Sequence, residues 1–111
     1  MPEATLVEVF GTSSVQSATD LVILKSSFSG VGLTPVAANT AESLFVSMIL
    51  RGAINLTEAN RLGDLLNRNV AVAFTGQDLV DQGGTSIFLR DTYQVSLYRA
   101  TTIQAVDPDN Y

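Results

Sequence analysis

The segment NTAESLFVSMILRGAINLTEAN, Asn39–Asn60, decides how the rest of the chain is arranged. Residues 44–50 are apolar with one exception, and the pattern permits two secondary structures. As a helix, the segment would be capped by Asn39 with Glu42 at the capping-box spacing, and Gly52 would supply a left-handed end. As a strand, it would turn alternate side chains to opposite faces. One of those faces would carry Leu44, Val46, Met48 and Leu50.

A strand is the favoured interpretation of residues 40–52, because a helix there would be apolar on nearly every side. A central strand covered on both faces is an ordinary structure for such a run. In either case we expect Leu44–Leu50 to form the centre of the core. Replacing Met48 by aspartate is therefore expected to unfold the protein, since the change would bury an unpaired charge.

Two further strands are expected on the N-terminal side of this segment. Thr5–Phe10 (TLVEVF) is rich in β-branched and aromatic residues and ends at a glycine. Asp20–Ser26 (DLVILKS) is an apolar run too short for a typical helix, so a buried strand is expected there. The polar residues 11–19 between them, and the glycine- and proline-containing residues 27–35 after them, are predicted to be loops.

One helix and one hairpin are expected on the C-terminal side. Thr57–Asn67 predicts a helix, because Thr57 is a favourable N-cap and an acid follows it in the first turn. Val70–Phe74 reads as a strand, and Ser86–Arg99 as one long strand or a strand broken near Asp91. The sequence DQGG at residues 81–84 has the chemistry of a turn between them.

Together these elements predict a small single domain of the α+β class, rich in strand and with one short helix. Five or six strands would form a sandwich or a partly open barrel. The domain is expected to span residues 1–105, followed by an irregular tail at residues 106–111.

Composition and charge exclude several classes of partner. The net charge is −5, and the six basic residues are dispersed along the chain, so nucleic-acid binding is not expected. The N-terminus shows no leader pattern and no apolar run is long enough to span a bilayer, so no membrane contact is expected. Charged residues make up only 15% of the chain, which suits a subunit surrounded by neighbours.

Catalytic chemistry has few candidate residues in this sequence. The chain contains neither histidine nor cysteine, which excludes a serine–histidine triad, a catalytic cysteine–histidine pair and a cysteine–histidine zinc site. Glu42 and Glu58 could form a carboxylate pair, but each also lies where the first turn of a helix favours an acid. We therefore predict no enzyme activity, no catalytic residue and no cofactor.

Binding motifs are equally sparse. Asp78 and Asp81 lack the alternating ligands of a calcium loop and are expected to be solvated beside the turn, so no metal site is predicted. The G-x-G at residues 30–32 has no supporting phosphate-binding residues, and Asn55 heads a formal glycosylation triplet that is expected to be a turn. The hairpin aromatics are expected to pack rather than to stack on bases or sugars. They are Phe74, Phe88, Tyr93 and Tyr98.

The segments NTAESLFVSMIL and NLTEAN, together with the terminal DPDNY, resemble small proteins of tailed phages and of phage-like particles of photosynthetic bacteria. The resemblance covers about seventy residues, from Asn39 to the end of the chain. It implies a structural virion protein, in a capsid decoration, neck, tail or baseplate, and brings no active-site residues with it.

From the resemblance we expect a non-enzymatic subunit located in the virion and assembled in the host cytoplasm. Its expected partners are other virion subunits or copies of itself, which would make it oligomeric in the particle. Residues 5–10 and the tail DPDNY are expected to reach a neighbour, because strand ends can pair between subunits. The alternatives are a small cytoplasmic binding or adaptor domain and, less favoured, a carboxylate-dependent hydrolase.

Overall fold

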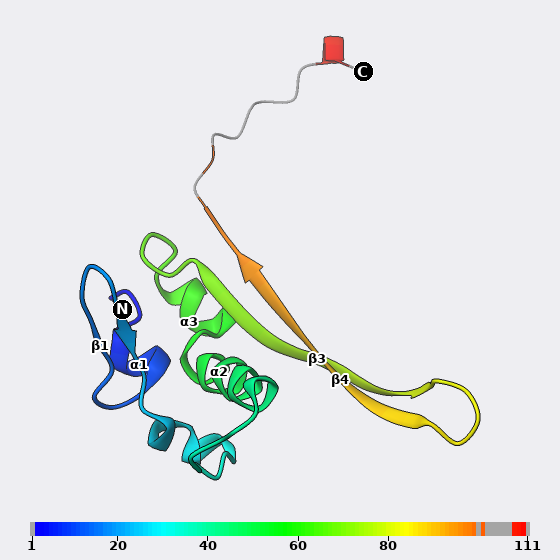
Figure 1. The fold of residues 1–111 in the computed structure, drawn as a ribbon. Coiled ribbons are helices and arrows are strands. Elements are labelled where there is room, and N and C mark those ends of the chain that lie inside the picture. The colour runs from blue at the N-terminus through cyan, green and yellow to red at the C-terminus, as the bar shows by residue number, and fades with distance from the viewer. Residues whose placement is uncertain (1, 100, 102–107, 111) are drawn as a thin grey trace.

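The computed structural model describes residues 2–99, 101 and 108–110 of the chain (Figure 1). Its longest helix, α2 (Ala41–Asn55), occupies the segment for which a strand was favoured, so that prediction is wrong. The hydroxyl of Thr40 caps the helix by accepting a hydrogen bond from the Ser43 N–H at 3.1 Å. Alanine, leucine, methionine and glutamate in this segment favour a helix, and its apolar sides are not all covered by other elements.

The helix α1 (Leu6–Phe10) also replaces a predicted strand. Thr5 and Glu8 form a complete capping box: the Thr5 hydroxyl accepts from the Glu8 N–H, and the Glu8 carboxylate accepts from the Thr5 N–H. These two bonds satisfy backbone donors that a strand would have left for a neighbour. Because residues 6–10 are helical, the segment 5–10 cannot add to a neighbour's sheet as a strand in this conformation.

The helix α3 (Glu58–Gly63) confirms the predicted helix start, with Thr57 as the N-cap. It ends at Gly63 rather than at Asn67, because the Asp64 carboxylate accepts from the backbone and side chain of Asn67 and closes a turn instead. With α1, α2 and α3 in the described part of the chain, the expectation of a single helix is wrong.

A small hairpin links α1 to α2. It consists of β1 (Val15–Gln16) and β2 (Leu21–Val22), so residues 11–19 are not entirely loop. The predicted strand at residues 20–26 is confirmed only over its first part, because the 3-10 helix η1 (Lys25–Val31) begins within it. Short irregular segments then lead to α2.

The predicted C-terminal hairpin is confirmed as β3 (Val70–Asp81) and β4 (Ile87–Leu97), antiparallel from Val70↔Leu97 to Asp81↔Ile87. Gly83 and Gly84 both take positive φ in the connecting turn, which glycine does without steric cost. Thr75 is paired with no residue of β4 and forms a β-bulge between the pairs Phe74↔Tyr93 and Gly76↔Thr92, while its hydroxyl donates to the Thr92 carbonyl at 3.1 Å.

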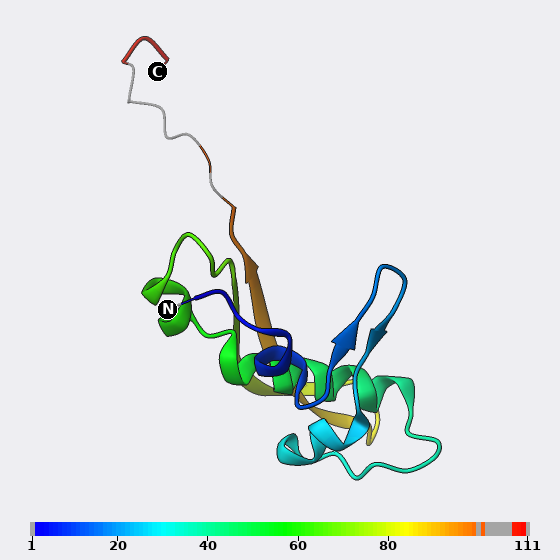
Figure 2. The same cartoon turned by 90° about the vertical axis from the view of Figure 1, so that its left-hand side faces the viewer.

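The arrangement is α+β, with two separate two-stranded sheets formed by the described strands. The helices α2 and α3 lie against the first half of β3, α1 packs against α2, and the second half of the β3–β4 hairpin extends beyond the helices (Figures 1 and 2). The described strands therefore do not form the expected sandwich or barrel within one chain.

Very little of the described chain is buried. Phe28 and Ala71 are its only buried hydrophobic residues, at 4% and 6% exposure. The expectation that Leu44–Leu50 forms the centre of the core is wrong, since only Ser47 of that run is buried and Met48 is 38% exposed. The apolar residues of α2 thus form a surface rather than an interior.

Candidate assembly surface

Exposed apolar side chains dominate the described surface. Twenty-one large apolar residues are exposed, against the two buried ones named above. Single exposed apolar residues are ordinary, but groups of them mark places where another molecule binds. Many of them lie in three regions: the far half of the hairpin, the base of the hairpin, and the groove between α2 and the hairpin.

The far half of the hairpin, residues 76–92, is called the arm. Cross-strand pairing places Leu79 and Leu89 opposite each other, with Ile87 next to them on the same face. These three side chains are 72%, 58% and 60% exposed, and Phe88 on the opposite face is 59% exposed. A two-stranded hairpin is marginally stable alone, so an arm with apolar residues on both faces is a surface to be covered.

Polar pairs occupy the middle of the arm. Arg90 binds Asp78 across the strands through bonds of 2.9 and 2.6 Å, and Gln77 donates to Asp91 at 2.7 Å. The Arg90 guanidinium lowers the pKa of the Asp78 carboxyl below its ordinary value, so the pair is charged at neutral pH. Solvated ion pairs of this kind fix the pairing of the strands more than they stabilise it.

The hairpin base carries a second apolar region, a groove of about 510 Å³ that also contains cations. Leu66 in this groove is 90% exposed and Leu65 is 57% exposed. Arg61 stacks on the Tyr98 ring with its guanidinium 3.7 Å from the ring centre, and Glu58 holds it there through hydrogen bonds. The complete lining, called the base groove, is Arg61, Leu65, Leu66, Asn69, Tyr98 and Arg99.

A third apolar region lies between α2 and the hairpin. This helix–hairpin groove has a volume of about 670 Å³ and is lined by Val46, Ile49, Leu50, Phe74, Asp91 and Tyr93. The Phe74 and Tyr93 rings pack across the strands with centroids 5.4 Å apart, which confirms the packing interpretation for this pair. Phe88, in contrast, points out from the arm with no ring partner among the described residues.

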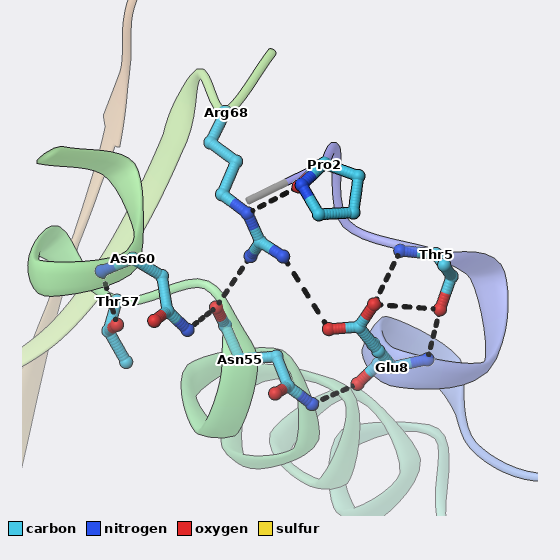
Figure 3. Close-up of polar contacts among 7 residues, drawn as sticks. All are labelled: Pro2, Thr5, Glu8, Asn55, Thr57, Asn60 and Arg68. Atoms are coloured by element: carbon cyan, nitrogen blue, oxygen red, sulfur yellow. Dashed lines mark hydrogen bonds and ion pairs between the residues drawn. The ribbon is translucent and has the colours of Figure 1, made fainter. Parts of the chain in front are cut away.

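A polar network fixes the helices to the hairpin (Figure 3). Arg68, only 7% exposed, donates to the carbonyl oxygens of Pro2 and Asn55 and lies 3.6 Å from the Glu8 carboxylate. Asn55 in turn donates to the Glu8 carbonyl at 2.6 Å. The cluster joins the N-terminal segment, the end of α2 and the start of β3, and its polar atoms are used internally.

Most of the acidic and amide residues considered above as catalytic, metal-binding or glycosylation candidates lie in helix ends and in the hairpin turn. Glu42 and Glu58 lie in the first turns of two different helices, α2 and α3, and Glu58 is bound by Arg61. Asp81 accepts the Gly83 N–H in the turn. Asn55 is the last residue of α2 rather than a turn residue.

The glycine pair at residues 30–32 lies at the end of η1, where Gly32 has a left-handed conformation. Within the described ranges, no three side chains of the metal-binding types come together.

The exposed apolar surface could not have been found from periodicity, because apolar residues in a strand or helix are ordinarily read as core. Its one signal in the sequence is the scarcity of charge alongside so many apolar residues. No helix in the described part of the chain is both long and apolar enough to cross a membrane. No protein-family model, curated protein or solved structure matches this chain.

Proposed function

We propose that the chain is a non-enzymatic structural subunit of a tailed-phage particle, assembled through protein–protein contacts. The observation that carries the proposal is the arm: a protruding hairpin whose Leu79, Ile87, Phe88 and Leu89 side chains are all more than half exposed. Covering such an element lowers the free energy, because its apolar surface is removed from water.

The whole described chain, and not only the arm, leaves large apolar side chains in water. Burying one valine, leucine or phenylalanine side chain contributes about 1.5–3 kcal/mol, and most of those in this chain remain exposed. Folding also costs conformational entropy, about 1–2 kcal/mol per residue for the backbone alone, and this cost opposes the gain from burial. Association with neighbours supplies the missing burial.

The hairpin backbone offers a second kind of contact. Few backbone groups on the outer edges of the described hairpin form hydrogen bonds. One that does is the Val72 N–H, which donates to the Leu56 carbonyl at 2.7 Å. Open edges of this kind pair with strands of another chain. The sandwich or partly open barrel expected from the strand count would then be built from hairpins of several copies.

The assignment to a phage particle is supported by the resemblance of Asn39–Asn60 and the terminal DPDNY to small phage proteins. The location that follows is the virion, with assembly in the host cytoplasm. Capsid decoration, neck, tail and baseplate positions all fit a small subunit with apolar surfaces.

Mass spectrometry of density-purified particles, from the bacterium that carries the gene, tests this proposal. A structural subunit is present in a fixed ratio to the major capsid or tail protein in every preparation. Absence from purified particles, while the chain is abundant in the same lysate, would overturn the proposal.

The helix–hairpin groove favours a second candidate, a small binding or adaptor domain. Its volume of about 670 Å³ and its lining of Val46, Ile49, Leu50, Phe74 and Tyr93 suit an apolar ligand or peptide side chains. Under this alternative the chain is absent from particles and stays monomeric. It also loses its partner on Ile49→Asp substitution but keeps it on the arm substitution Leu79→Asp.

A further inference from the structure

We infer that copies of this chain dock head to tail, with the tip of one arm in the base groove of the next copy. The inference rests on the proposed function, since it names the partner and the surfaces through which the subunit assembles. It commits to a second copy of the same chain as the occupant of the base groove.

The arm is apolar and acidic. Residues 76–92 contain three carboxylates, Asp78, Asp81 and Asp91, and one cation, Arg90, which leaves a net charge of −2 (three negative charges against one positive). Asp78 is paired with Arg90, and Asp91 lines the helix–hairpin groove, so Asp81 is the carboxylate at the tip. Asp81 and Ile87 are opposite each other at the last strand pair, so a carboxylate lies directly beside the exposed Leu79–Leu89 face. A partner surface must offer apolar contact and positive charge together.

The base groove offers that combination. It is lined by Leu65, Leu66 and Tyr98 together with two guanidinium groups, and no carboxylate is among its lining residues. Arg61 is already held by Glu58, whereas Arg99 makes no hydrogen bond or ion pair with any other described residue. Arg99 is therefore the group available to meet Asp81 at the tip of a neighbour's arm.

The two surfaces cannot meet within one chain. The base groove lies beside the first strand pair, Val70↔Leu97, and the arm tip is at the last pair, Asp81↔Ile87. A strand rises about 3.3 Å per residue, so the ends are separated by roughly 35 Å along the hairpin. Figure 1 shows α3 beside one end of the hairpin and the turn at the other. Only a second copy can bring a tip to this groove.

Docking would remove exposed apolar side chains of both copies from water. Leu79, Ile87 and Leu89 share one face of the arm, and Leu65, Leu66 and Tyr98 line the base groove. A standard interface buries about 800 Å² on each partner, so these side chains would form the apolar centre of the contact and polar neighbours the remainder.

The contact is heterologous, because tip and groove are different surfaces. Every docked copy leaves one tip and one groove open, so the contact repeats until a ring closes or a filament grows. This property separates head-to-tail docking from a symmetric dimer, in which the same surface meets itself.

Mixing two complementary variants tests the inference. The tip variant carries Leu79→Ser and Leu89→Ser, and the base variant carries Leu66→Ser and Arg99→Glu; all four positions are exposed, so the monomer should keep its circular dichroism spectrum. Analytical ultracentrifugation of the wild-type chain is expected to show species larger than a dimer. Each variant alone should associate at least about 100-fold more weakly, since two side chains lose their burial.

The mixture should form a one-to-one complex and nothing larger. The base variant keeps a working tip and the tip variant keeps a working groove, so they join once and then stop. The exposed loop substitution Val36→Ser is the matched control and should leave wild-type assembly unchanged.

Two results would overturn the inference: a wild-type chain that stays monomeric up to its solubility limit, or a variant mixture that forms no complex. A monomeric chain found in stoichiometric amount in particles would refute self-docking and leave the proposed function standing. A chain that forms head-to-tail oligomers but is absent from particles would refute the proposed function and leave the docking mode standing.

Discussion

The Nε of Arg68 donates a hydrogen bond of 2.9 Å to the carbonyl oxygen of Pro2, 66 residues earlier in the chain. The bond ties the N-terminal segment to the residues that open β3. Since few apolar side chains are buried, this polar contact carries an unusual share of the tertiary structure.

Replacing Arg68 by methionine should lower the free energy of unfolding by about 1–3 kcal/mol, because the change removes the hydrogen bonds that this buried guanidinium donates to the Pro2 and Asn55 carbonyl oxygens and its ion pair with Glu8. Urea denaturation followed by circular dichroism measures it. The matched control is Arg90→Met, which removes an arginine from a solvated pair on the arm and should leave the midpoint almost unchanged. Equal losses for both variants would show that the Arg68 network has no special role.

Acid should destabilise the protein partly through Glu8. The Thr5 backbone N–H lowers the pKa of the Glu8 carboxyl below its ordinary value of 4.5, with further lowering from the Thr5 hydroxyl and from Arg68. A carboxyl with a lowered pKa in the folded state stabilises that state above its ordinary pKa, and the contribution disappears as the pH falls through the folded value.

The melting temperature should therefore change little from neutral pH down to about pH 5 and then drop below the ordinary carboxyl pKa. Glu8→Gln should start lower and show a shallower drop, because one of the titrating contributions is gone. A variant whose acid profile runs parallel to the wild type would contradict this assignment.

Gly11 should tolerate no side chain. Its φ is +101°, and a Cβ placed there would overlap the Cβ and Oγ of Ser27. Gly11→Ala should cost about 2–5 kcal/mol, from backbone strain together with overpacking. Gly32→Ala is the control, since Gly32 has φ of +104° but open space around it, and it should cost only the strain of about 1–2 kcal/mol.

Met48→Asp should destabilise the protein by about 1–3 kcal/mol, because Met48 lines an apolar space of about 240 Å³ with Val9, Phe10 and Val95. Since Met48 is 38% exposed, partial solvation of the carboxylate should allow a folded variant. Phe45→Asp, at a position 64% exposed on the same helix, should leave the melting temperature nearly unchanged. Complete unfolding by Met48→Asp would contradict this prediction and would indicate that Met48 is a core residue, as expected from the sequence.

The melting temperature should also depend on protein concentration. Folding and association are linked when exposed apolar surface becomes covered only in the oligomer, so dilution should lower the melting temperature. Differential scanning calorimetry over a hundredfold range of concentration measures this. A constant value would mean that the monomer carries all of its own stability.

The hairpin and the start of α3 could be predicted because their signals are local. The turn residues at 81–84 and the cap at Thr57 act within a few positions of themselves. The helix α1 had an equally local signal, the Thr5–Glu8 capping box, but the β-branched residues between the two obscured it.

The helix α2 was missed for another reason. The strand interpretation assumed that an apolar segment must be buried on all sides, and the structure leaves Phe45 and Val46 exposed. Likewise, nothing in the spacing of Pro2, Glu8, Asn55 and Arg68 shows that they meet, because their hydrogen bonds join residues 13 to 66 positions apart in the sequence. Which side chains are covered, and which distant residues meet, depends on the tertiary arrangement, and the periodicity of the sequence does not encode that arrangement.

The bulge at Thr75 shifts by one residue which side chains of β3 face the helices. Before it, the even-numbered residues Val70, Val72 and Phe74 share the helix-side face; beyond it, the odd-numbered Leu79 takes that side with Leu89. Deleting Thr75 would remove the extra residue and leave the pairs from Gly76↔Thr92 to Asp81↔Ile87 in register, so Leu79 and Leu89 would stay on one face. The deletion would instead remove the local bend and added twist of β3, and with them the direction in which the arm leaves the helices. A one-codon change would thus redirect assembly without altering a single apolar residue.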